Sequence, residues 1–192
     1  LAPIVDDIFF IGPDSIGQAW LGAVLFAFQI YFDFSGYSDI AVGAAYLLGF
    51  RIPLNFRTPY LSAGPAEFWQ RWHISLSSWL RDYLYISLGG TRHGKLKTHR
   101  NLVLTMLLGG LWHGAAWTFV AWGALHGVYL ITQRVLGRSY RALVTQLKIP
   151  KVMDDIFLVF LVFAGTCVAW IFFRADNFPV AFTYLSRMCS LE

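Results

Sequence analysis

The chain has 192 residues, of which 57% are hydrophobic, 18% aromatic and only 14% charged. Soluble domains carry about 25% charged residues, so this composition, with a mean hydropathy of +0.54, excludes an ordinary soluble protein and indicates an integral membrane protein. Thirteen of the 15 lysines and arginines lie between Arg51 and Lys151. Because basic residues gather in the cytoplasmic loops of membrane proteins, we attribute the net charge of +4 to topology and expect no nucleic-acid partner.

The first apolar run covers residues 16–32, which is about the length that crosses a bilayer. It leads into residues 32–39, where two carboxylates and a glycine are expected to break the helix before a second apolar run at 40–50. Irregular backbone at membrane depth must be enclosed by protein or line a water-filled cavity. Asp33 and Asp39 therefore bind a polar group in such a cavity, pair with arginines of other segments, or shape the broken helix.

Residues 65–88 show the three- and four-residue spacing of apolar side chains that predicts one amphipathic helix. Its tryptophans and tyrosines suit the membrane–water interface, so we place it in the cytoplasmic surface. Arg81 and Asp82 within it form either a local ion pair of little energetic consequence or a contact that orders a substrate entrance. The basic loop at 89–100 either anchors the topology or attracts an acidic ligand by steering.

Residues 101–133 contain no Asp, Glu, Lys or Arg, but they contain His113 and His126. One helix of that length would measure about 50 Å, would overshoot the hydrocarbon core of about 30 Å, and would place its basic flanks on opposite sides. A hairpin of two short helical arms satisfies both the length and the charge rule, with its turn near residues 109–114. His113 is then deep in the membrane and His126 lies nearer the cytoplasmic return.

A further membrane helix is expected at residues 156–173, with residues 1–14 and the tail after Arg174 outside the cell. The predicted fold is an all-α integral membrane protein, a multi-helix bundle with a re-entrant helical hairpin and an interfacial amphipathic helix. Because the chain starts at Leu1 and shows no signal-peptide pattern, we expect residues 1–192 to be a fragment of a single membrane domain.

The two histidines of the uncharged window are candidate functional residues. An ionisable side chain at membrane depth is costly and is a functional-site hypothesis by default, and histidine can transfer protons near neutral pH. The alternative is a buried histidine that only hydrogen-bonds a neighbouring helix. The histidines and cysteines show no metal-ligand spacing, so no metal site is expected.

Four segments resemble, in order, the signature motifs of the membrane-bound O-acyltransferase family, and within it the bacterial alginate O-acetyltransferase branch. The segments are residues 32–41 (FDFSGYSDIA), 68–77 (FWQRWHISLS), 79–86 (WLRDYLYI) and 110–114 (GLWHG). The match extends over about residues 19–137, and four ordered motifs are far more specific than one Trp-His-Gly string. Members of the family are considerably longer, which agrees with a fragment.

The resemblance implies a bundle of membrane helices around a central tunnel, which an acyl donor enters from the cytoplasm and an acceptor hydroxyl from the other face. The intramembrane histidine of the family falls on His113 and its second histidine on His73, which makes both candidate catalytic residues; His73 would orient substrate or assist His113, unless it is only an interface histidine. Candidates to line or support the tunnel are Trp112, Arg81, Asp82, Asp33 and Asp39.

The resemblance also implies acetyl-CoA as the acyl-donor substrate, with no bound cofactor. The implied partners are membrane lipid, acetyl-CoA or an acyl carrier, periplasmic acetyltransferase proteins and a polysaccharide acceptor, and the implied location is the bacterial cytoplasmic (inner) membrane, crossed several times. We therefore expect O-acetylation of an exported, alginate-like polysaccharide or of a periplasmic acetyl relay. Two alternatives stay open: D-alanyl transfer toward teichoic acid by the same family, and a membrane transporter, since broken spans with carboxylates at a cavity also occur in transporters.

Overall fold

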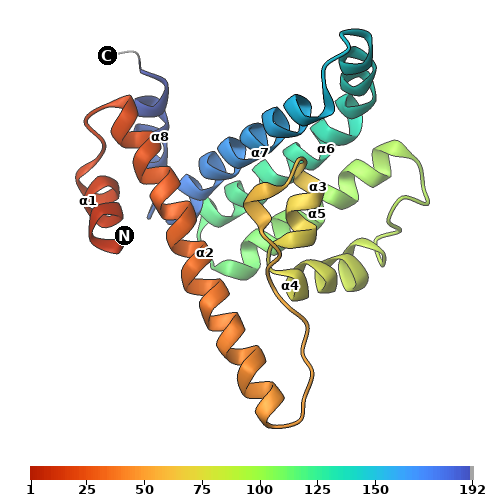
Figure 1. The fold of residues 1–192 in the computed structure, drawn as a ribbon, viewed down its shortest axis with the longest axis horizontal. Coiled ribbons are helices and arrows are strands. Elements are labelled where there is room, and N and C mark those ends of the chain that lie inside the picture. The colour runs from red at the N-terminus through yellow and green to blue at the C-terminus, as the bar shows by residue number, and fades with distance from the viewer. Residues whose placement is uncertain (191–192) are drawn as a thin grey trace.

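The computed structural model describes residues 1–190, and its regular structure is helical, with no β-strand in that range (Figure 1). The α-helices are α1 (Ala2–Ile11), α2 (Ile16–Leu47), α3 (Pro65–Arg71), α4 (Ile74–Trp79), α5 (Lys95–His113), α6 (Trp117–Gln146), α7 (Lys151–Arg174) and α8 (Phe178–Cys189). A 3₁₀ turn, η1 (Pro59–Leu61), precedes α3, and a π-helical segment, η2 (Leu80–Tyr85), continues α4. The prediction of an all-α fold is confirmed.

α2 is one continuous helix of 32 residues, so the predicted break at residues 32–39 is wrong. Its N-terminus is capped by Ser15, whose Oγ accepts a hydrogen bond from the Gln18 amide at 3.2 Å. A helix satisfies its backbone polar groups internally, and a glycine inside it costs only about 1 kcal/mol. Asp33 and Asp39 remain exposed on this helix, about 120° apart around its axis, and do not interrupt it.

Two helices of the described residues, α2 and α7, are long and apolar enough to cross a membrane. α7 confirms the helix expected at residues 156–173 and extends it at both ends. Figure 1 shows the N-terminal half of α2 beside α1 and α8, whereas its C-terminal part projects away from the other helices. The large side chains exposed on this projecting part include Tyr37, Ile40, Tyr46 and Leu47. An apolar surface of this kind suits lipid or further protein rather than water.

α5 and α6 run antiparallel and form the predicted helical hairpin, with the turn at residues 114–116. Two glycines bring the backbones into contact, since a Cβ on Gly110 would lie 2.3 Å from the Phe119 carbonyl oxygen and one on Gly123 would lie 2.2 Å from the Met106 carbonyl oxygen. Small residues allow this close approach between membrane helices. The predicted arms were too short, because both helices continue into their basic flanks.

The single amphipathic helix predicted at residues 65–88 is instead divided into α3, α4 and η2. α3 ends at Arg71, and the chain kinks at His73, whose φ of 43° lies in the left-handed region. The Ile74 amide donates to the carbonyl oxygen of Asn55, which lies in the loop after α2, at 3.0 Å. A hydrogen bond to a distant segment thus replaces the next turn of the helix and overrides the helical periodicity.

Aromatic rings form the core where α2, α3, α6 and α7 meet. Trp122 of α6 and Trp170 of α7 are each 1% exposed and stack with 5.7 Å between centroids. Phe68 of α3 stacks on Trp72 at the same centroid distance. The Tyr60 hydroxyl donates to a backbone carbonyl of α2 at 2.6 Å and accepts from Trp170 Nε1 at 3.2 Å. This core supports both the end of α5 and the kink after α3, where the candidate histidines lie.

Candidate functional site

His113 is the last residue of α5 and lies at the hairpin turn, as predicted. Its half-buried ring stands nearly perpendicular to those of Trp122 and Phe173, with 5.1 Å between centroids in each case. The ring of Trp112 lies 4.9 Å away, and that of Phe119 closes the cluster at 6.4 Å. Because these rings come from α5, α6 and α7, three helices together determine where the imidazole points.

His73 lies at the kink between α3 and α4, far from His113 in the sequence but close to it in space. Its ring packs edge-on against Phe34 of α2, with 4.7 Å between centroids, and also meets Trp112 edge-on, with 6.3 Å between centroids. Trp112 therefore neighbours both imidazoles. The structure brings His73, Trp112 and His113 into one cluster, hereafter the histidine cluster.

The backbone of His73 is held in its left-handed conformation by Asn55, in the loop between α2 and η1. The Asn55 carbonyl oxygen accepts from the Ile74 amide at 3.0 Å. Its side-chain Oδ1 accepts from the Ser75 amide at 3.1 Å and from the Ser75 hydroxyl at 2.7 Å. A left-handed residue with a side chain costs about 1–3 kcal/mol and occurs preferentially at functional sites. The loop thus stabilises an unfavourable conformation at a candidate catalytic residue.

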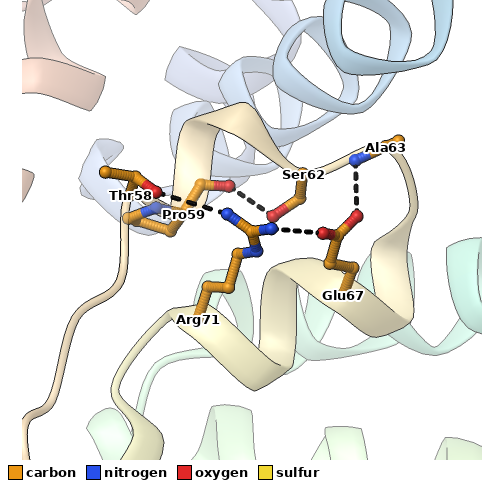
Figure 2. Close-up of polar contacts among 6 residues, drawn as sticks. All are labelled: Thr58, Pro59, Ser62, Ala63, Glu67 and Arg71. Carbon is orange, nitrogen blue, oxygen red and sulfur yellow. Dashed lines mark hydrogen bonds and ion pairs between the residues drawn. The ribbon is translucent and has the colours of Figure 1, made fainter. Parts of the chain in front are cut away.

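A second polar network, shown in Figure 2, fastens the other end of this loop to α3. Glu67 Oε2 accepts from the Ala63 amide at 2.8 Å, and Glu67 Oε1 accepts from Arg71 at 2.6 Å. Arg71 also donates to Thr58 Oγ1 at 3.3 Å, and its carbonyl oxygen accepts from the Arg57 amide at 3.0 Å. Sequence reasoning missed this network, although the i,i+4 spacing of Glu67 and Arg71 is a signal for the ion pair.

The other predicted support residues lie apart from these contacts. Arg81 donates to both carboxylate oxygens of Asp82, at 2.6 and 3.0 Å, and this exposed pair is the local ion pair of the first alternative. The hydrogen bonds from Arg81 hold the pKa of the Asp82 carboxyl below its usual value. Within residues 1–190, Asp33 and Asp39 form no ion pair with an arginine. Their predicted role in shaping a broken helix is wrong, since α2 is continuous.

His126 is buried in the core, with 2% of its surface exposed. Its ring stacks on Phe68 at 5.8 Å and stands perpendicular to Trp69 at 5.0 Å. The ring of Trp122 neighbours both histidines of the uncharged window, with its centroid 4.9 Å from that of His126 and 5.1 Å from that of His113. His126 also lines a mainly apolar cavity of about 670 Å³ between α6, α7 and the start of α3. For His126 this packing favours the alternative of a buried, structural histidine.

The histidine cluster lies at an open, apolar face of the described chain. Trp112 is 61% exposed and Trp117, just beyond the hairpin turn, is 76% exposed. Imidazoles beside large aromatic rings offer proton transfer and hydrogen bonding in a mainly apolar setting. In the part of the chain that the structure describes, no group of three His, Cys, Asp or Glu side chains is suited to hold a metal ion.

The family model of membrane-bound O-acyltransferases matches residues 9–173, which include all of the histidine cluster. The chain belongs to the membrane-bound O-acyltransferase family. It is therefore a membrane protein, in agreement with its two apolar helices, and the relatives described below are all bacterial. Membership of an acyltransferase family speaks against the transporter alternative.

Relatives from several bacteria resemble the chain over most of its length. It is 52% identical to the probable alginate O-acetylase AlgI of Azotobacter vinelandii over 190 residues, 99% of this chain and 36% of the relative. It is 43% identical to the peptidoglycan O-acetyltransferase of Helicobacter pylori, over 91% of this chain and 32% of the relative. Identity to the teichoic acid D-alanyltransferase of Streptococcus thermophilus is 37%, over 56% of this chain and 28% of the relative. The chain thus spans about a third of the length of these proteins.

Proposed function

We propose that this chain forms the catalytic core of a bacterial membrane O-acyltransferase, which moves an acetyl group from acetyl-CoA toward a hydroxyl of an exported, alginate-like polysaccharide or of a periplasmic acetyl relay. The observation that carries the proposal is the histidine cluster, in which two distant motifs of the family meet beside Trp112. The names of the Azotobacter and Helicobacter relatives, an alginate O-acetylase and a peptidoglycan O-acetyltransferase, support a polysaccharide as the final acceptor.

In the proposed mechanism, His113 acts as the general base. The acceptor hydroxyl gives its proton to an unprotonated ring nitrogen of His113 while its oxygen attacks the carbonyl carbon of the thioester. The carbon–sulfur bond then breaks, and the leaving thiolate takes the proton from the imidazolium, which restores neutral His113. A positioned base contributes roughly 10²–10⁴-fold to the rate. The rings of Trp112, Trp122 and Phe173 make the surroundings of His113 apolar, and a further wall over this face would exclude water and so strengthen each polar interaction of the transition state.

We further propose that α5 and α6 form a re-entrant hairpin in the inner membrane, with their basic ends in the cytoplasm, and that the histidine cluster lines a central tunnel. The positive-inside rule supports this orientation. The exposed Trp112 and Trp117 support a further wall, which the rest of the longer protein would supply as part of the same domain. The donor would then reach His113 from the cytoplasm and the acceptor from the periplasm.

Transfer of D-alanine remains the second candidate, because a D-alanyltransferase also matches this chain. Acetyl-CoA and a D-alanyl carrier protein can be compared directly as donors for the purified full-length protein. Label that passes from acetyl-CoA to a hydroxylated acceptor supports the acetyltransferase, whereas label that passes only from the D-alanyl carrier supports the alternative.

The role of His113 can be tested in cells that lack the chromosomal copy of the gene. Full-length protein with His113→Ala should reduce the O-acetyl content of the exported polymer at least about 10²-fold, the contribution of a general base. The matched control is His93→Ala in the exposed basic loop, which should leave acetylation unchanged. Both variants should reach the membrane in equal amounts. Normal acetylation by the His113 variant would refute the mechanism.

A further inference from the structure

The hydrogen bonds around Asn55 determine where the protons of its neighbours lie. Asn55 Oδ1 receives the Ser75 backbone amide at 3.1 Å and the Ser75 hydroxyl oxygen at 2.7 Å. A backbone N–H can only donate, so the atom of the Asn55 amide that faces Ser75 must be its oxygen rather than its nitrogen. The Ser75 hydroxyl therefore also donates to Asn55 Oδ1, and its one hydrogen is committed there.

Once its hydrogen is committed, Ser75 Oγ has only lone pairs to offer. His73 Nδ1 lies 3.4 Å from this oxygen. A neutral imidazole carries its proton on one nitrogen and a lone pair on the other, and the hydrogen bond at one nitrogen selects the tautomer. Only a protonated Nδ1 makes a favourable contact with the lone pair of Ser75 Oγ.

We infer that Asn55, acting through Ser75, holds neutral His73 as the Nδ1–H tautomer and so leaves Nε2 as a hydrogen-bond acceptor. This inference rests on the proposed function and assigns a role within it. An unprotonated Nε2 can accept a hydrogen bond from the acceptor hydroxyl and orient it, but it cannot donate to the developing oxyanion. Asn55 and Ser75 are thus positioning residues for His73.

The backbone supports the same assignment. The conformation of His73, with φ 43° and ψ 56°, is disfavoured for a residue with a Cβ. It is maintained because the same asparagine accepts from the Ile74 and Ser75 amides on the far side of the kink. One loop residue therefore determines both the place of the imidazole and its tautomer.

The tautomer can be measured directly by nitrogen NMR on full-length protein in lipid nanodiscs, with ¹⁵N in its histidine rings and the His73 signals identified by their loss in His73→Gln. We expect a protonated Nδ1 and an unprotonated Nε2. Ser75→Ala should shift His73 toward the Nε2–H form. Asn55→Ala should do the same although the hydroxyl remains, because Ser75 can then donate to Nδ1. An Nε2–H tautomer in the unaltered protein, or spectra that neither variant changes, would overturn the inference.

Kinetics with the same proteins separate positioning from structure. Ser75→Ala should lower kcat about 3- to 10-fold, the loss typical of one neutral hydrogen bond, without changing KM. Ser75→Thr keeps the hydroxyl and should restore kcat. Ser78→Ala is the matched control, because this hydroxyl lies on the same helix and bonds only backbone carbonyls of α4. An equal loss of kcat in the Ser75→Ala and Ser78→Ala variants would contradict the positioning role of Ser75.

The two proposals can fail separately. If the unaltered protein transfers no acyl group and His73 still carries the Nδ1 proton, the proposed function is wrong and the tautomer assignment for His73 is right. If acyl transfer proceeds and His73 carries the Nε2 proton, the tautomer assignment is wrong and the proposed function is unaffected.

Discussion

The contact between α5 and α6 predicts a severe effect of a single methyl group. In Gly110→Ala the new Cβ would lie 2.3 Å from the Phe119 carbonyl oxygen and 3.4 Å from the Gly123 Cα. The first contact is about 1 Å too short, and both neighbours are backbone atoms, so no side chain can turn away. The two helices must separate, which we expect to cost about 1–3 kcal/mol, as overpacking does.

The same separation should affect activity more than stability. His113 lies one helical turn beyond Gly110, and its ring packs against that of Trp122 on the opposite helix, with 5.1 Å between centroids. A displacement of about 1 Å at a reacting group can cost about 10²-fold in rate. We therefore expect Gly110→Ala to lower acyl transfer by about two orders of magnitude while some folded protein remains.

Stability can be measured by thermal unfolding in detergent, with size-exclusion chromatography as the readout. Acyl transfer is measured in the same preparation. The matched control is Gly137→Ala on α6, where an added Cβ meets nothing within 4 Å. This control should be neutral, or more stable by about 0.5–1 kcal/mol, since alanine favours a helix over glycine. If the Gly110 and Gly137 variants melt alike and transfer acyl groups alike, the close packing of the hairpin is refuted.

Two further predictions concern the hairpin and the loop. Single cysteines in place of Lys95 and Arg138 should both react with a membrane-impermeant thiol reagent from the cytoplasmic side, because the hairpin returns the chain to the side on which it began. Labelling from opposite sides would mean one tilted helix and a different place for His113. Arg71→Ala should lower the melting temperature and acyl transfer together, because it removes the donors to Glu67 and Thr58 in Figure 2 and loosens the kink at His73. Arg71→Lys, which keeps the charge beside Glu67, should lose less, and equal loss in both variants would contradict this reading.

The hairpin was predictable because its causes are local. The uncharged window at 101–133 and its basic flanks can be read directly from the sequence, and the rise of a helix against the bilayer thickness leaves few arrangements. The same reasoning placed His113 at the turn, where the structure has it. The apolar run of α7 was equally plain. Hydropathy, charge and helix length need no knowledge of distant partners.

The continuity of α2 shows where local reasoning failed. Two carboxylates and a glycine suggested a break, but the backbone groups in the interior of a helix bond to one another, and exposed carboxylates cost the helix little. The kink at His73 shows the opposite failure. Periodicity predicted an unbroken helix there, and hydrogen bonds to Asn55, which the chain pattern does not signal, end it.

Composition, hydropathy and motif spacing were enough to predict the helical class, the membrane setting, the helical hairpin, and His73 and His113 as candidate catalytic residues. The packing of distant segments was needed to show that His73 and His113 meet beside Trp112 and that His126 belongs to the aromatic core. It also showed that Arg81 and Asp82 pair with each other. The physical reason is one of range. Hydropathy and helical period act over a few neighbouring residues, whereas the partners that orient an imidazole come from helices and loops that only folding brings together.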